Sequence, residues 1–83
     1  MDVKIIVNEK GNPPGKLAEA ELHFPDGPLA GLKLVGFAVW ERRTGGGRNV
    51  TFPARLLGYS AAQHSIRDAI LAAYANIETQ VTT

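Results

Sequence analysis

The sequence contains no cysteine among its 83 residues and no long apolar run. Without cysteine there can be no disulfide framework, no thiolate nucleophile and no cysteine-ligated metal site. No segment approaches the ~18 apolar residues of a membrane span, and the apolar run of residues 3–7 is too short for a secretory signal. We therefore expect a cytoplasmic protein.

Catalytic motifs are also scarce. His23 shares a predicted strand face with Glu21, and His64 falls in the first turn of a predicted helix, but neither belongs to a fixed-spacing motif such as His-Glu-x-x-His. Two surface histidines are the ordinary interpretation, while a composite metal site of His23, Glu21 and a third residue from elsewhere stays open. No nucleophile and base, or pair of carboxylates, stands at a defined spacing. We expect no enzyme, no cofactor and no small-molecule substrate.

The whole chain is almost neutral, but its charged residues are unevenly distributed along the sequence. The net charge is +1, yet residues 1–32 carry three lysines against five acids, whereas residues 33–60 carry five bases against one acid. A local excess sets the potential that a partner meets at a surface. The central segment therefore suggests an anionic partner, with a simple solvated basic face as the alternative.

The apolar pattern predicts a single α+β domain over residues 1–83, because a chain of this size buries only about 60 to 65% of its unfolded surface and cannot form two cores. Residues 3–8, 16–24, 29–43 and 48–53 are predicted to be strands, joined by connections rich in glycine and proline. They make a four-stranded antiparallel β-sheet (meander). Apolar residues then recur at helical spacing, which predicts one C-terminal α-helix over residues 61–78 packed on the sheet. Ser60 and Gln63 fit a capping box at its start.

The predicted strand 29–43 is apolar on both faces in its middle, which is typical of a central strand or of one whose outer face is covered by a partner subunit. Gly31 and Gly36 are candidates for bends or bulges in it. Strict alternation places Trp40 on the face of Leu34, so we expect Trp40 in the core, and we expect Phe52 there too by its parity with Val50.

Four of the five arginines surround a triple glycine between the last two strands. Arginine binds phosphate in a bidentate manner and stacks on bases, which lysine cannot do. Because adjacent strand residues face opposite sides, we expect the arginines to divide between two faces. The Gly45–Gly47 tip is either a flexible turn or a loop that moulds to phosphates, and it is followed by a strand instead of the helix that a phosphate-binding loop requires. The candidate nucleic-acid-binding residues in and beside this hairpin are Arg42, Arg43, Arg48 and Arg55.

Two runs resemble the SpoVG (stage V sporulation protein G) family of bacterial regulators. One is Val50-Thr51-Phe52-Pro53-Ala54-Arg55, an apolar strand that runs into a proline, a small residue and a basic residue. The other is Ile66-Arg67-Asp68-Ala69-Ile70-Leu71-Ala72-Ala73-Tyr74, which is similar to the family's carboxy-terminal helix. The family usually has a second basic residue and a short extra strand after the proline, where this chain has Leu56-Leu57-Gly58-Tyr59. The order of the earlier strands also matches, so the resemblance is to a divergent member and covers most of the chain.

The resemblance implies a homodimeric, sequence-tolerant DNA- or RNA-binding regulator. It carries over Arg55 as a phosphate contact and Arg67 as a weaker candidate. Our first hypothesis is thus nucleic-acid binding through the basic hairpin. The alternative is a protein-interaction or dimerisation module without nucleic-acid binding, using the doubly apolar strand as its surface.

Overall fold

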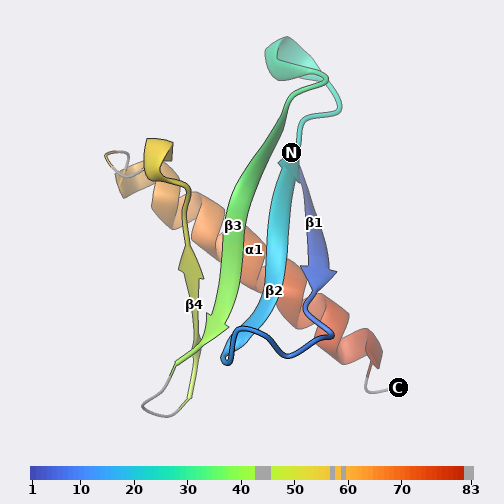
Figure 1. The fold of residues 1–83 in the computed structure, drawn as a ribbon. Helices are drawn as coiled ribbons and strands as arrows, with labels where there is room; N and C mark the ends of the chain where they lie inside the picture. The colour runs from blue at the N-terminus through green and yellow to red at the C-terminus, as the bar shows by residue number, and fades with distance from the viewer. Residues whose placement is uncertain (43–45, 57, 59, 82–83) are drawn as a thin grey trace.

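The chain folds into one antiparallel sheet with a single long helix across one face (Figure 1). The computed structural model describes residues 1–42, 46–56, 58 and 60–81, apart from the side chains of Arg55 and residues 79–81. The sheet has four strands in the order β1-β2-β3-β4, which confirms the predicted α+β meander. The elements are β1 (Asp2–Val7), β2 (Lys16–His23), the short 3₁₀ helix η1 (Gly27–Leu29), β3 (Lys33–Glu41), β4 (Arg48–Thr51), a second 3₁₀ helix η2 (Ala54–Leu56) and α1 (Ser60–Val81).

The core lies between α1 and the sheet. On β2 the alternation works as predicted, because Ala18, Ala20 and Leu22 are buried while Glu19 stays exposed on the opposite face. We call the sheet face that points away from α1 the outer face. The core cluster comprises Ala18, Ala20, Leu22, Phe37, Val39, Val50, Ile70 and Tyr74.

A bulge in β3 changes which side chains enter this core. Leu22 pairs with Leu34 and Ala20 pairs with Phe37, so β3 has one more residue than β2 between these pairs. Gly36 adopts a φ of 100° there, which an L side chain rarely adopts. The extra residue turns Phe37 toward α1 and Trp40 away from it. The prediction of Trp40 in the core is therefore wrong.

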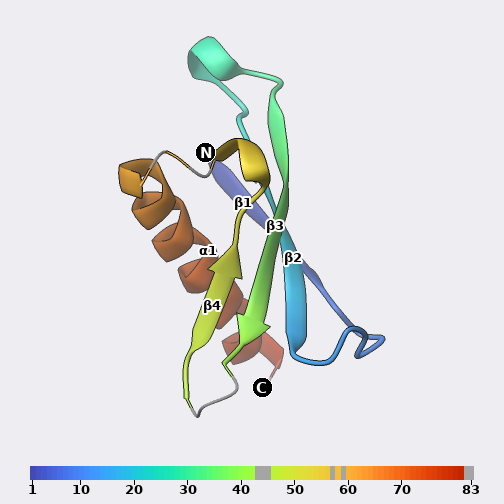
Figure 2. The ribbon, with the colours of Figure 1, turned by 60° about the vertical axis from the view of Figure 1, so that its left-hand side comes forward.

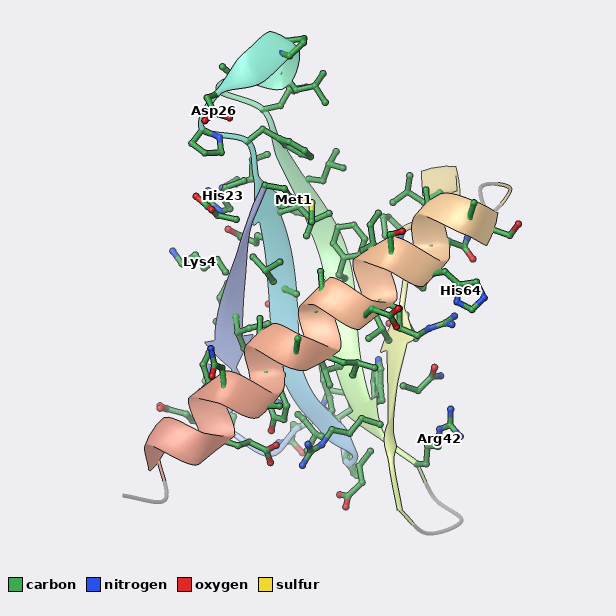
Figure 3. All side chains as sticks on the ribbon, turned by 180° about the vertical axis from the view of Figure 1, so that it is seen from behind. Met1, Lys4, His23, Asp26, Arg42 and His64 are labelled. Carbon is green, nitrogen blue, oxygen red and sulfur yellow. The ribbon has the colours of Figure 1, made fainter. Side chains whose placement is uncertain are left out.

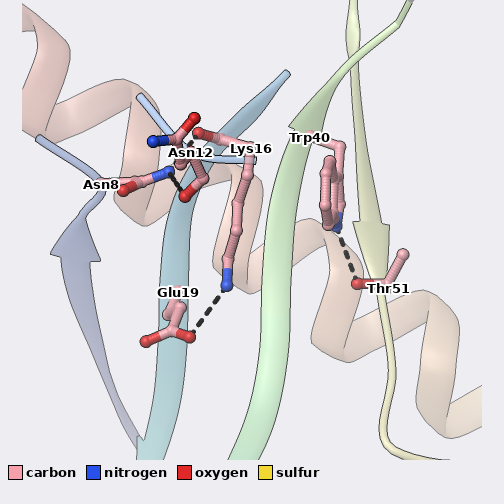
Figure 4. Close-up of polar contacts among 6 residues, drawn as sticks. All are labelled: Asn8, Asn12, Lys16, Glu19, Trp40 and Thr51. Atoms are coloured by element: carbon pink, nitrogen blue, oxygen red, sulfur yellow. Dashed lines mark hydrogen bonds and ion pairs between the residues drawn. The ribbon is translucent and has the colours of Figure 1, made fainter. Parts of the chain in front are cut away.

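Phe52 does pack against the core, as predicted. Its ring meets Phe37 edge-on, with centroids 5.9 Å apart and planes at 83°. Trp40 instead donates its indole Nε1–H to Thr51 Oγ1 on the outer face at 3.0 Å (Figure 4).

The β2–β3 connection is longer than the sequence suggested. Residues 29–32 are not a strand, because Ala30 N donates to Gly27 O at 3.1 Å and Leu32 N donates to Leu29 O at 3.0 Å, which are the bonds of tight turns. This connection projects beyond the rest of the sheet (Figures 1 and 2) and leaves Leu29 and Leu32 about half exposed.

At the opposite end, the β1–β2 connection is closed by one side chain. Asn8 Nδ2 donates to the carbonyls of Asn12 and Lys16, each at 3.0 Å (Figure 4). A single amide thus holds together a loop with two prolines and two glycines, which forms few backbone bonds of its own.

The helix α1 begins at Ser60, one residue before its predicted start, and buries Ile70 and Tyr74 against the sheet. The expected capping box is not formed, because the side-chain amide of Gln63 donates to the Leu56 carbonyl instead. That bond fastens the first turn of α1 to η2. None of the helices in the described ranges is long and apolar enough to cross a membrane.

Candidate nucleic-acid interface

The β3–β4 hairpin holds Arg42 and Arg48 at one end of β4. The Arg42 amide donates to the Gly47 carbonyl at 3.3 Å, and Glu41 stands opposite Arg48 in the register. The Arg42 side chain is exposed and passes over Gly47, where an added Cβ would lie 3.7 Å from Arg42 Cδ (Figure 3). No carboxylate partner for Arg42 occurs among the residues that the structure describes.

Arg48 behaves differently because it points toward α1. Both of its terminal nitrogens donate to the two carboxylate oxygens of Glu78, and its guanidinium carbon lies 4.9 Å from the Tyr74 ring centroid. The pair is partly open to solvent, with 37% and 38% of the two side chains exposed. A phosphate would have to compete with Glu78 for this arginine. Glu78 and Tyr74 were missed by the sequence analysis, since nothing in a sequence marks a partner thirty residues away.

Arg67 lies at the other end of β4. Its guanidinium carbon is 5.9 Å from the centroid of Phe52, the residue that follows β4. Its Nε is buried without a hydrogen-bond partner in the described part of the chain. The packing of α1 therefore places Arg67 beside the end of β4.

The remaining predicted contacts cannot be placed. Arg43 lies outside the described residues, as do Thr44 and Gly45 of the hairpin tip. Arg55 belongs to η2, which begins two residues after the end of β4, but its side chain lies outside the described part. The predictions for both arginines stay predictions.

The outer face of β2 and β3 carries charges that pair with one another. Lys16 contacts Glu19 at 2.9 Å (Figure 4), and Lys33 lies 3.9 Å from Glu21. His23 Nε2 is 3.0 Å from Glu21 Oε1. The hydrogen bond from His23, with a smaller contribution from the charge of Lys33, lowers the pKa of the Glu21 carboxyl below its usual value despite partial desolvation.

The contact between His23 and Glu21 bears on the composite metal site that the sequence left open. The two side chains do come together, and a lysine lies beside them. Within residues 1–42, 46–56, 58 and 60–81 no group of three or more histidine and acidic side chains is placed to hold a metal ion.

No family model, curated protein or solved structure matches this chain.

Proposed function

We propose that this protein binds DNA or RNA phosphates along β4, as a regulator of the kind that the SpoVG resemblance implies. One observation carries the proposal. Lys16 and Lys33 on the outer face have carboxylate partners, whereas Arg42 and Arg67, at the two ends of β4, have none among the described residues. A guanidinium that is not neutralised by a carboxylate is available to bind a phosphate.

The geometry of β4 supports this assignment. Gly47 to Phe52 spans about 17 Å of extended chain at about 3.3 Å per residue, so the two arginines can meet different phosphates of one strand. Contacts to phosphates position a protein without reading the sequence. We expect binding that tolerates many sequences.

The two runs that carry the family resemblance also meet in space. Residues 50–55 form the end of β4 and η2, and residues 66–74 lie in α1. Arg67 over Phe52 and the bond from Gln63 to Leu56 join the two regions. The two family-like runs thus meet where Arg67, one of the two proposed phosphate contacts, lies over Phe52.

Fluorescence anisotropy with labelled mixed-sequence single- and double-stranded DNA and RNA, at two salt concentrations, tests the proposal. Each of Arg42→Ala and Arg67→Ala should reduce the salt slope by roughly 0.9 on duplex DNA and about 0.7 on single strands. Lys16→Ala is the matched control, because it removes a cation that already has a carboxylate partner. It should leave the affinity unchanged.

Two results would refute the proposal. One is an unchanged affinity in the double variant Arg42→Ala/Arg67→Ala. The other is an equal loss in Lys16→Ala, which would indicate nonspecific attraction by the whole surface.

The interaction module without nucleic-acid binding is the second candidate. The half-exposed Leu29, Leu32 and Val35 on and near the β2–β3 connection favour it. Absence of salt-dependent binding to every nucleic acid tested would shift the conclusion to this candidate.

A further inference from the structure

The side chain of Trp40 lies on the outer face of the sheet, and no helix or strand of the described chain covers it. The helix α1 lies on the opposite face (Figures 1 and 2). Trp40 is only partly buried. Its neighbours on β4 are Asn49, which stands opposite it in the register, and Thr51, and both are exposed. A large aromatic ring is therefore accessible beside the last strand.

Contacts at two sides hold the Trp40 ring in place. Its indole Nε1–H donates to Thr51 Oγ1 at 3.0 Å (Figure 4). At its other side the β1–β2 connection passes close by, since a Cβ added to Gly15 would lie 4.0 Å from Trp40 Cε3. A ring that is already held in one orientation loses little conformational entropy when a ligand stacks on it. Trp40 is thus a pre-formed aromatic surface on a sheet face that is otherwise mostly polar.

Arg42 supplies the available positive charge near this ring. It follows Trp40 by two residues, so about 6.6 Å of extended chain separates the two, and strand alternation starts both side chains on the same face. Arg42 is exposed and has no carboxylate partner in the described part of the chain. Lys16 stands opposite Trp40 on β2, but it is paired with Glu19 at 2.9 Å. An anionic group that approaches Trp40 therefore meets Arg42.

We propose that Trp40 stacks on an unpaired base of a strand whose phosphate Arg42 contacts, so that the ligand of this site is single-stranded DNA or RNA. The inference rests on the proposed function and names its ligand. In a duplex both faces of a base are covered by its neighbours, so the ring can meet only a base that is unpaired and unstacked. Every base has a π-face, so a stacking contact tolerates many sequences, as the phosphate contacts do.

Trp40 is the single tryptophan of the chain, which makes stacking directly observable. A stacked base quenches indole emission, so an oligonucleotide of about ten thymidines, a length typical of single-strand sites, should lower the fluorescence of Trp40. An abasic strand of the same length keeps the phosphates and lacks the bases. It should bind about tenfold more weakly and leave the emission unchanged, as should a duplex. A uridine oligonucleotide in parallel shows whether DNA or RNA is the tighter ligand, and quenching by either one supports the proposal.

Salt dependence separates the role of Trp40 from that of Arg42. Trp40→Ala should weaken binding of the thymidine strand about tenfold at both salt concentrations and leave the salt slope unchanged, because a stacking contact releases no counterion. Trp40→Phe keeps an aromatic ring and should retain most of the affinity. Leu29→Ala is the matched control, since it shortens a half-exposed apolar side chain away from Trp40. It should leave both the affinity and the quenching unchanged.

Three results would overturn the proposal. They are equal affinity for the thymidine and abasic strands, unchanged Trp40 emission when the thymidine strand is bound, and an affinity that survives in Trp40→Ala. The first two come from the unaltered chain, so misfolding of a variant cannot imitate them. If any of the three accompanies salt-dependent binding that Arg42→Ala/Arg67→Ala abolishes, stacking is refuted and the proposed function stands. Absence of binding to every strand refutes both.

Discussion

Single residues decide which arginines are available to a ligand. The sequence predicts that Arg48 acts with the other hairpin arginines, because all lie close together in it, but its bond to Glu78 and its contact with Tyr74 direct it inward. Arg42 lies beside the same strand end without such a partner among the described residues. The difference arises from a contact between β4 and the end of α1, which local sequence patterns do not reveal.

Glu78→Gln should therefore increase affinity for nucleic acids. The change releases Arg48 from its carboxylate, and the salt slope on duplex DNA should rise by roughly 0.9 if Arg48 then contacts a phosphate. Because the pair is more than one third exposed, the free energy of unfolding should fall by only about 0.2–1 kcal/mol. Anisotropy titrations and urea denaturation measure the two effects. Glu78→Gln combined with Arg48→Ala is the control, and a gain in affinity that survives in this double variant contradicts the explanation.

Glu21 should give the fold a dependence on acid pH. Its pKa is lowered in the folded chain, mainly by the hydrogen bond from His23, so its contribution to stability is present above the unfolded pKa of about 4.3 and is lost as the pH falls through the lower folded value. An NMR titration of the Glu21 carboxyl should show a pKa below the usual range. In His23→Ala this pKa should move upward, and an identical titration in both proteins would argue against the assignment.

At the scale of elements, the bulge in β3 sets the composition of both sheet faces. The alternation of β2 could be recognised from its sequence because no irregularity interrupts Ala18, Ala20 and Leu22. The alternation of β3 is interrupted at Gly36, and strict parity carried through that glycine places Trp40 on the wrong side. A glycine indicates that a bulge is possible there, but only the pairing with β2 shows that it forms.

Gly36→Ala should destabilise the fold by roughly 1–3 kcal/mol through its left-handed backbone alone. The added Cβ would also lie 3.2 Å from Pro53 Cβ, which requires Pro53 to move. Gly31→Ala is the matched control, because Gly31 has a φ of 88° with no neighbouring atom within 4 Å. Thermal denaturation of both variants should show the larger loss for Gly36→Ala, and equal losses would remove the role assigned to Pro53.

For the whole molecule, much of the architecture could be predicted from the sequence. The four strands, their order and the terminal helix can be predicted from local periodicity and from turn residues. Both signals depend only on residues that are close together in the sequence. Besides Trp40, the errors lie at residues 29–32, where backbone bonds between residues three apart form turns, and at Gln63, which reaches Leu56 instead of Ser60. The candidate site could be predicted only as a basic segment. Its division into paired and unpaired arginines depends on where α1 lies across the sheet.

The strand order also fixes a length. Because β1 and β4 are the opposite edges of the sheet, three strand spacings of about 4.8 Å separate them, or about 14 Å measured along the sheet. The phosphate contacts that we propose beside β4 therefore lie at one edge of the molecule, and the β1 edge stays free for a different neighbour.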